Sequence, residues 1–134
     1  MSRLSAFLHP VVTDETREVV ISERFQDKEG NALPFVIRPL TQAENEYIGK
    51  LCTNSKGEFD NVAYTQRVVV AATVDPDFSA SEMLKTYSPN PQEPLVSPLQ
   101  VPGRMLLAGE YAKLAKEIMH LSGFDVDLAE LAKN

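Results

Sequence analysis

The chain has 134 residues, 43% of them hydrophobic, and its 13 basic and 19 acidic residues give a formal net charge of −6. This length and composition predict a single folded domain over residues 1–134 and exclude a disordered chain. Lys and Arg do not cluster, which argues against nucleic acid as a partner because phosphate contacts need clustered cations.

The sequence also lacks the segments that would bring the chain to a membrane. No apolar run approaches the roughly 18 residues that span a bilayer, and the early run "LSAFL" is too short for a signal peptide. The single cysteine, Cys52, excludes an internal disulfide. We therefore expect a soluble cytoplasmic protein with no membrane partner.

The N-terminal third predicts a β-hairpin. Residues 4–8 predict one helical turn, which Pro10 ends. The β-branched run "VVISERF" at Val19–Phe25 alternates like a strand, and "PFVIRPL" at Pro34–Leu40 predicts a second strand. The turn-forming cluster "QDKEGNAL" lies between them, so we expect a hairpin over about 19–40.

The first helix expected after the hairpin covers about 41–53. Thr41 followed by Glu44 has the spacing of a capping box, in which each residue satisfies a backbone N–H of the other. Apolar residues at helical spacing predict its buried face: Tyr47, Ile48, Leu51 and Cys52.

A second helix is expected over about 60–74, capped by Asp60 or Asn61. Its run "VVVAATV" is β-branched and apolar nearly all round, so a strand remains an alternative. The length of the segment favours a helix that is buried on most sides and ends before Pro76.

Residues 79–103 combine a short helix with a proline-rich loop. Ser79 and Glu82 have capping-box spacing and predict a helix over about 79–87. The stretch "SPNPQEPLVSPLQVPG" carries five prolines, so we expect residues 88–103 to form an extended loop with little regular structure.

Two further helices are expected near the C-terminal end of the sequence. The segment 109–121 is amphipathic, and Gly123 predicts a left-handed C-cap after it. A short helix over about 125–133 would be capped by Asp125 or Asp127. The predicted fold class is therefore α+β and mainly α, with an N-terminal β-hairpin followed by a bundle of about four or five helices.

A search for reactive groups finds no catalytic pattern. His9 and His120 lie far apart in the sequence, whereas a metal-binding pair needs both histidines on one helical face. Cys52 has no nearby histidine and is typical of a core residue. The Asp pairs in "DPD" and "DVD" lie at helix boundaries, where Asp caps are expected. We predict no catalytic, cofactor-binding or metal site, and no enzymatic activity.

The helix over 109–121 carries more apolar surface than one core face requires. One row is predicted to be core: Tyr111, Leu114, Ile118 and Leu121. A second row beside it is a candidate partner-binding surface, because small residues and methionine adapt to a partner: Ala108, Ala112, Ala115 and Met119. Two alternatives stay open, since either another helix of the chain, such as the segment Val68–Val74, or a partner or second copy covers this row.

Several stretches together resemble the XkdN-like family of tail assembly chaperones of long-tailed phages. They are "LSAFLHP", "VVISERFQDKEGNALPFVIRPLTQAENE", "VVAATVDPDF" and "MLLAGEYAKLAKEIMHLSGFD", and they follow the order of the family over nearly the whole chain. One departure is the proline-rich stretch at 88–103, which is longer and richer in proline than the family suggests.

This resemblance implies a non-enzymatic factor in the host cytoplasm that uses no cofactor. Such proteins bind the tape measure protein, keep it soluble, help to recruit tail tube protein and leave before the tail matures. The chain is then not expected in the mature virion, and self-association is compatible with this role. The alternative function is a structural virion component, such as a small tail or head-completion protein.

Overall fold

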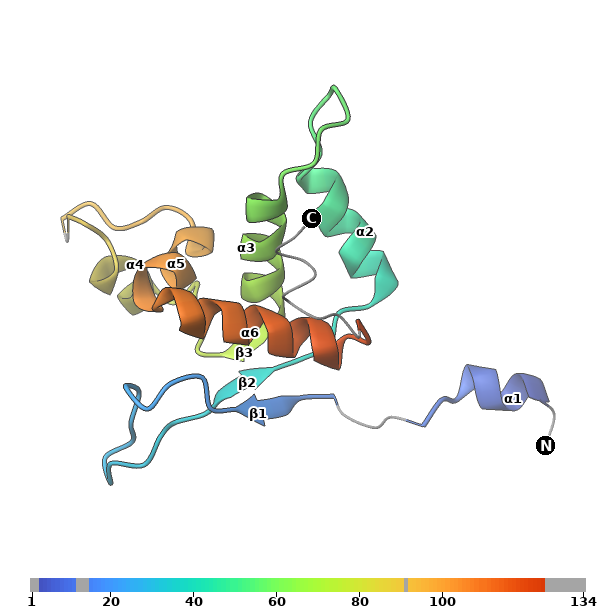
Figure 1. The fold of residues 1–134 in the computed structure, drawn as a ribbon, viewed down its shortest axis with the longest axis horizontal. Coiled ribbons are helices and arrows are strands. Elements are labelled where there is room, and N and C mark those ends of the chain that lie inside the picture. Colours follow the sequence, from blue (N-terminus) through green and yellow to red (C-terminus); the bar gives the residue numbers. More distant parts are fainter. Residues whose placement is uncertain (1–2, 12–14, 91, 125–134) are drawn as a thin grey trace.

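The computed structural model describes residues 3–11, 15–90 and 92–124, and it is α+β and mainly helical, as predicted (Figure 1). A short helix and two strands come first, and five α-helices, one 3₁₀ turn and a third strand follow in the described residues. In chain order the elements are α1 (Arg3–Leu8), β1 (Arg17–Val19), β2 (Phe35–Ile37), α2 (Gln42–Leu51), α3 (Asn61–Ala72), β3 (Thr73–Asp75), α4 (Ser81–Thr86), η1 (Pro98–Gln100), α5 (Val101–Met105) and α6 (Ala108–Leu121).

The predicted hairpin pairs as expected and its arms run over 17–37, but its strands are much shorter than predicted. β1 pairs antiparallel with β2, with Arg17 opposite Ile37 and Val19 opposite Phe35. The sequence run from Val19 to Phe25 was predicted as one strand, and this extent is wrong because β1 already ends at Val19. The two arms pair again farther along the hairpin, at the isolated bridge between Gln26 and Ala32.

Contacts outside the sheet hold the segment 20–34. The Phe25 ring packs against the Phe35 ring, with their centroids 5.7 Å apart. Arg24 Nε donates to Glu110 Oε2 on α6 at 3.0 Å, and Lys113 Nζ donates to the carbonyl oxygen of Val20 at 2.8 Å. These contacts to α6 add to the backbone pairing within the segment, where the Leu33 N–H donates to the Phe25 carbonyl oxygen at 2.7 Å.

The run "VVVAATV" is both helix and strand. α3 continues to Ala72, and the next residue, Thr73, begins β3, which pairs antiparallel with β2. The Thr73 hydroxyl donates to the Val69 carbonyl oxygen at 2.6 Å, so this buried polar group is satisfied. The sheet order is β1-β2-β3, and the prediction of one uninterrupted helix over 60–74 is wrong in its last turn.

Local capping signals had mixed outcomes. Thr41 and Glu44 form the predicted capping box of α2, and Asp60 caps α3 by accepting from the backbone N–H of Ala63 at 3.1 Å. The predicted box at Ser79 is wrong, because α4 begins only at Ser81. The Ser79 hydroxyl instead donates to Asp77 Oδ1 at 2.6 Å, which lowers the pKa of the Asp77 carboxyl.

The end of the proline-rich stretch is not the extended loop that we expected for 88–103. Ser97 Oγ accepts from the Leu99 N–H at 3.2 Å and starts the η1 turn, which leads directly into α5. Pro98 and Pro102 lie in the first turns of these helices, where proline is tolerated because the N–H that it lacks has no helical partner. Val101 is 0% exposed and joins the core.

The core is built around α3 and α6, which pack against each other. The predicted core row of α6 is confirmed, with Leu114 and Ile118 fully buried and Tyr111 and Leu121 partly buried against the cluster. Gly123 follows α6 with a φ of +93°, the left-handed conformation expected of a C-cap glycine. The helix predicted over 125–133 lies outside the described residues.

Candidate partner-binding surface

α2 divides its apolar residues between the core and the surface. Ile48 and Cys52 are buried, as the predicted face requires. Tyr47 and Leu51 belong to the same predicted face, yet they are 65% and 45% exposed. One helical stripe therefore serves two surfaces, and its outer half is available to a partner.

The exposed half of α2 borders a groove of about 280 Å³, which we call the α2–α3 groove. α2 supplies one wall, α3 supplies the opposite wall, and Leu99 of η1 also contributes to the lining. Most of the lining is apolar: Tyr47, Ile48, Leu51, Val70, Ala71 and Leu99. A groove of this kind, between two helices and with few polar groups, suits the apolar face of a third helix.

Two opposite charges also line the groove, Glu44 on α2 and Arg67 on α3. Arg38 holds the Glu44 carboxylate in a two-pronged pair, with Arg38 Nη2 2.7 Å from Glu44 Oε2 and Nη1 3.1 Å from Oε1. These Arg38 bonds, helped by the Thr41 N–H, lower the pKa of Glu44 to about 2. The Glu44 charge on the α2 wall is therefore already balanced by Arg38 within the chain.

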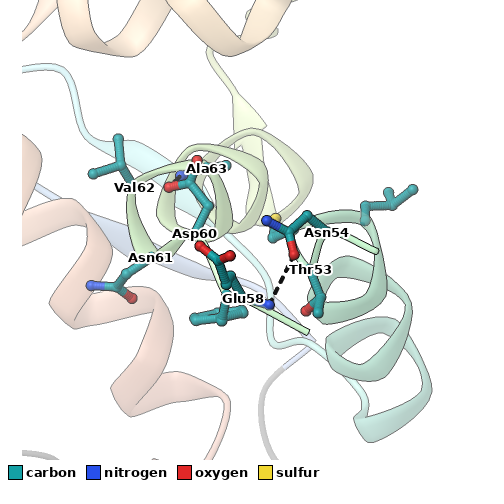
Figure 2. A pocket seen from close by; sticks show the side chains of 10 residues that line it. Thr53, Asn54, Glu58, Asp60, Asn61, Val62 and Ala63 are labelled. Atoms are coloured by element: carbon teal, nitrogen blue, oxygen red, sulfur yellow. Dashed lines mark hydrogen bonds between the residues drawn. The ribbon is translucent and has the colours of Figure 1, made fainter. Parts of the chain in front are cut away.

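A second hollow, of about 590 Å³, lies at the turn between α2 and α3 (Figure 2). Its polar groups serve the local fold: Asn54 Oδ1 accepts from the Glu58 N–H at 3.0 Å, and Asp60 caps α3. Phe59 and Val62 line this hollow and are exposed, and Leu51 lines both this hollow and the groove. Leu51 therefore links the groove to the hollow at the α2–α3 turn.

The described residues bring none of the candidate reactive groups into a reactive cluster. His9 and His120 are exposed on the N-terminal segment and on α6, and Cys52 is buried beneath α2. Within the described ranges, no group of three or more His, Cys, Asp or Glu residues could hold a metal ion. Asp125 and Asp127 lie outside these ranges.

The residues of the predicted second row of α6 differ in their exposure. Ala108 and Ala112 are exposed, whereas Ala115 and Met119 are half-buried and pack against the core. α3 packs against α6, and the fully buried residues of α6, Leu114 and Ile118, belong to the predicted core row. A partner role for the second row stays a prediction, and the exposure favours its first two members.

Comparison with known proteins identifies the family. Residues 4–134 match the family model described as phage XkdN-like tail assembly chaperone protein. The chain belongs to this family. YqbN of Bacillus subtilis (strain 168) is 36% identical over 143 aligned positions, which cover 96% of this chain and 92% of YqbN. XkdN of the phage-like element PBSX in the same organism is 32% identical, with coverage of 96% of this chain and 93% of XkdN.

The fold of this tail assembly chaperone is also similar to a solved one. The crystal structure of YqbN superposes with a TM-score of 0.74 at 33% identity, covering 90% of this chain and 96% of that chain. Tail assembly chaperones are generally non-enzymatic, in agreement with the sequence-based expectation. In the described residues, no helix has the length and apolar character needed to cross a membrane.

Sequence reasoning missed the exposed apolar residues at the α2–α3 groove and turn. They are Tyr47, Leu51, Phe59 and Val62. Helical spacing gave the side of α2 on which Tyr47 and Leu51 lie, but not how far α3 would cover that side. No local pattern marks this surface, because the apolar residues of α2 lie on one helical stripe and the placement of α3 decides which of them stay exposed.

Proposed function

We propose that this tail assembly chaperone binds the phage tape measure protein in the host cytoplasm, keeps it soluble and helps to recruit tail tube subunits. Membership of the XkdN-like family supports the assembly role. The observation that supports a client-binding site is the exposed apolar α2–α3 groove. The chaperone then has no place in the mature particle.

A helix of the client would lie in the groove through apolar anchors at positions i, i+3, i+4 and i+7. Tyr47 and Leu51 are one turn apart on α2 and both exposed, so a docked helix buries them without unfolding the chaperone. Full burial of one such side chain contributes about 1.5–3 kcal/mol, so a single groove binds weakly. Many copies along one long client would hold it through avidity.

The charges of the groove would set the direction of the client helix. Arg67 carries a positive charge on the α3 wall, whereas the Glu44 charge on the α2 wall is already paired with Arg38. A client helix with an acidic residue toward α3 pairs with Arg67. Such pairs contribute more to orientation than to affinity.

The second row of α6 is a proposed additional contact. Ala108 and Ala112 are small and exposed, so another helix can approach closely there. Tail tube protein or a neighbouring chaperone copy would use this surface while the groove holds the client. Ala115 and Met119 would then contribute only at its edge, because they already pack against the core.

Co-expression with the tape measure protein of the same phage tests this function. The wild type should keep the tape measure protein in the soluble fraction, and Leu51→Glu should lose most of this effect. Leu33→Glu is the matched control, because Leu33 is 48% exposed and lies in the 20–34 segment, far from α2 (Figure 1). If Leu51→Glu protects the client as well as Leu33→Glu does, the groove is not the client site.

Mass spectrometry of purified mature particles separates the chaperone from its alternative. A chaperone should be missing from them, whereas a structural virion component should be present in a fixed ratio to the tail proteins. A fixed ratio would overturn the proposed function even if the groove variants reduce assembly.

A further inference from the structure

The N-terminal helix α1 exposes an apolar face that none of the described residues buries. Leu4, Phe7 and Leu8 lie on one side of the helix, at positions i, i+3 and i+4, and Val11 follows shortly after. All four side chains are exposed, with Phe7 at 74%. α1 has no buried residue and lies apart from the other elements in Figure 1.

A helix as short as α1 needs a surface to pack on. It has six residues, and isolated helices shorter than about 12–15 residues are marginal in water. Most helical stability in proteins comes from packing of an apolar face. The apolar face of α1 therefore indicates that this helix docks on a surface that it does not contact within the single chain.

The α2–α3 groove has the chemistry to receive this face. The groove is mostly apolar and open to solvent. On its α2 side, Tyr47 and Leu51 are exposed and can contact a docked helix. The charge of α1 also suits an acidic second copy, because residues 3–11 contain Arg3 and no acidic residue, whereas the whole chain carries a formal net charge of −6. Arg67 on the α3 wall repels Arg3, so the charges favour one direction of docking, with Arg3 toward α2.

We propose that α1 of one copy docks in the α2–α3 groove of a second copy. In a single chain the apolar face of α1 and the α2–α3 groove are both exposed. One contact between two copies buries one α1 face and one groove. Reciprocal exchange closes a dimer, and one-way docking builds an open chain of copies. This inference rests on the proposed function, because α1 then occupies the client's groove and the client must displace it.

Light scattering coupled to size-exclusion chromatography tests the docking without any client. The wild type should gain mass as its concentration rises, and Phe7→Glu should weaken this association by roughly tenfold or more. Ala6→Glu is the matched control, because Ala6 is exposed on the opposite side of the same helix. A wild type that stays monomeric, or an equal loss from both variants, would overturn the inference.

A pull-down with the tape measure protein separates failure of the inference from failure of the proposed function. Leu51→Glu should lose both self-association and client binding, whereas Phe7→Glu should lose self-association alone and bind the client at least as well as the wild type. If Phe7→Glu stays associated but loses the client, α1 is a client contact and the inference is wrong. If the wild type is monomeric and Leu51→Glu still loses the client, the proposed function holds without the inference. Circular dichroism confirms that each variant is folded.

Discussion

Glu110 joins two parts of the molecule through one carboxylate. It accepts from Arg24 Nε at 3.0 Å, which ties the 20–34 segment to α6, and from the Leu107 N–H at 2.8 Å, which caps α6. The Arg24 bonds, with help from Ser22 and the Leu107 N–H, lower the pKa of Glu110 from its ordinary 4.5 to about 2. Protonation of this one residue should therefore weaken both connections.

The lowered pKa of Glu110 predicts a loss of stability in acid. A carboxyl whose folded pKa lies below its unfolded value contributes its full stability above about pH 5 and loses it as the pH falls toward about 2. Glu110→Gln should lower the free energy of unfolding at pH 7 and have a clearly smaller effect at pH 2.5, where most of the contribution is lost. Urea unfolding of both proteins at the two pH values measures this, and Glu44 contributes equally to both proteins. An equal difference at both pH values would contradict the assignment to Glu110.

Single residues also show what the sequence could and could not predict. The Thr41–Glu44 box and the Asp60 cap were predictable because all their partners lie within three residues. Ser79 failed because Asp77 Oδ1 accepts from the Ser79 backbone N–H at 3.0 Å, the N–H that a capping-box Glu82 would bind, and capping-box spacing does not reveal such a competitor. Local signals are therefore reliable only where no other neighbour offers a better hydrogen bond.

Among the elements, the proline-rich stretch differs most from its prediction. Five prolines favour an extended chain, but two of them lie where short helices begin, and the residues between and after them supply apolar side chains to the core. Whether such a segment forms an extended loop or part of the core depends on which of its side chains pack against other elements. Composition alone does not reveal these tertiary contacts.

Valine truncations test whether the end of this stretch is core. Val101 is 0% exposed and Val96 is 96% exposed, so the pair compares the same change in two surroundings. Val101→Ala should lower the free energy of unfolding by about 2 kcal/mol, from lost burial and the cavity left behind. Val96→Ala should stay within about 0.5 kcal/mol of the wild type. Equal effects in thermal or urea unfolding would mean that 88–103 is the extended loop that the sequence predicted.

The second row of α6 shows what the spacing of apolar residues in a helix can and cannot predict. It predicted correctly that α6 is apolar on more than one side, but not that the far end of the row would pack against the core. How much of a helix is buried depends on the elements packed against it. The spacing of apolar residues along the helix does not reveal those elements. The exposed residues at the α2–α3 groove went unrecognised for the same reason.

Glutamate substitutions along this row should separate its two ends. Met119→Glu places a charge against the core and should lower the melting temperature markedly, whereas Ala112→Glu should leave it nearly unchanged. Thermal melting followed by circular dichroism measures both. A melting temperature that falls equally in the two variants would show that the whole row is core and that no part of it is left for a partner.

At the scale of the whole molecule, the chain combines a conserved fold with unpaired apolar surfaces. It retains the fold of YqbN at 33% identity. Its core is buried around α3 and α6, yet the α2–α3 groove and α1 remain apolar and exposed. The net charge of −6 keeps such a molecule apart from its copies at long range, so the apolar contacts must select their partners at close range. Function here depends on surfaces that a single chain leaves open.

Site-specific photo-crosslinking tests the central claim, that the α2–α3 groove holds the client, most directly. A photoreactive phenylalanine replaces Tyr47 in one variant and Leu33 in another, because both positions are exposed and only the first lines the groove. After irradiation with the tape measure protein, position 47 should give a strong covalent adduct and position 33 little or none. An adduct of equal yield at both positions, or none at position 47 while the client is bound, would contradict the account.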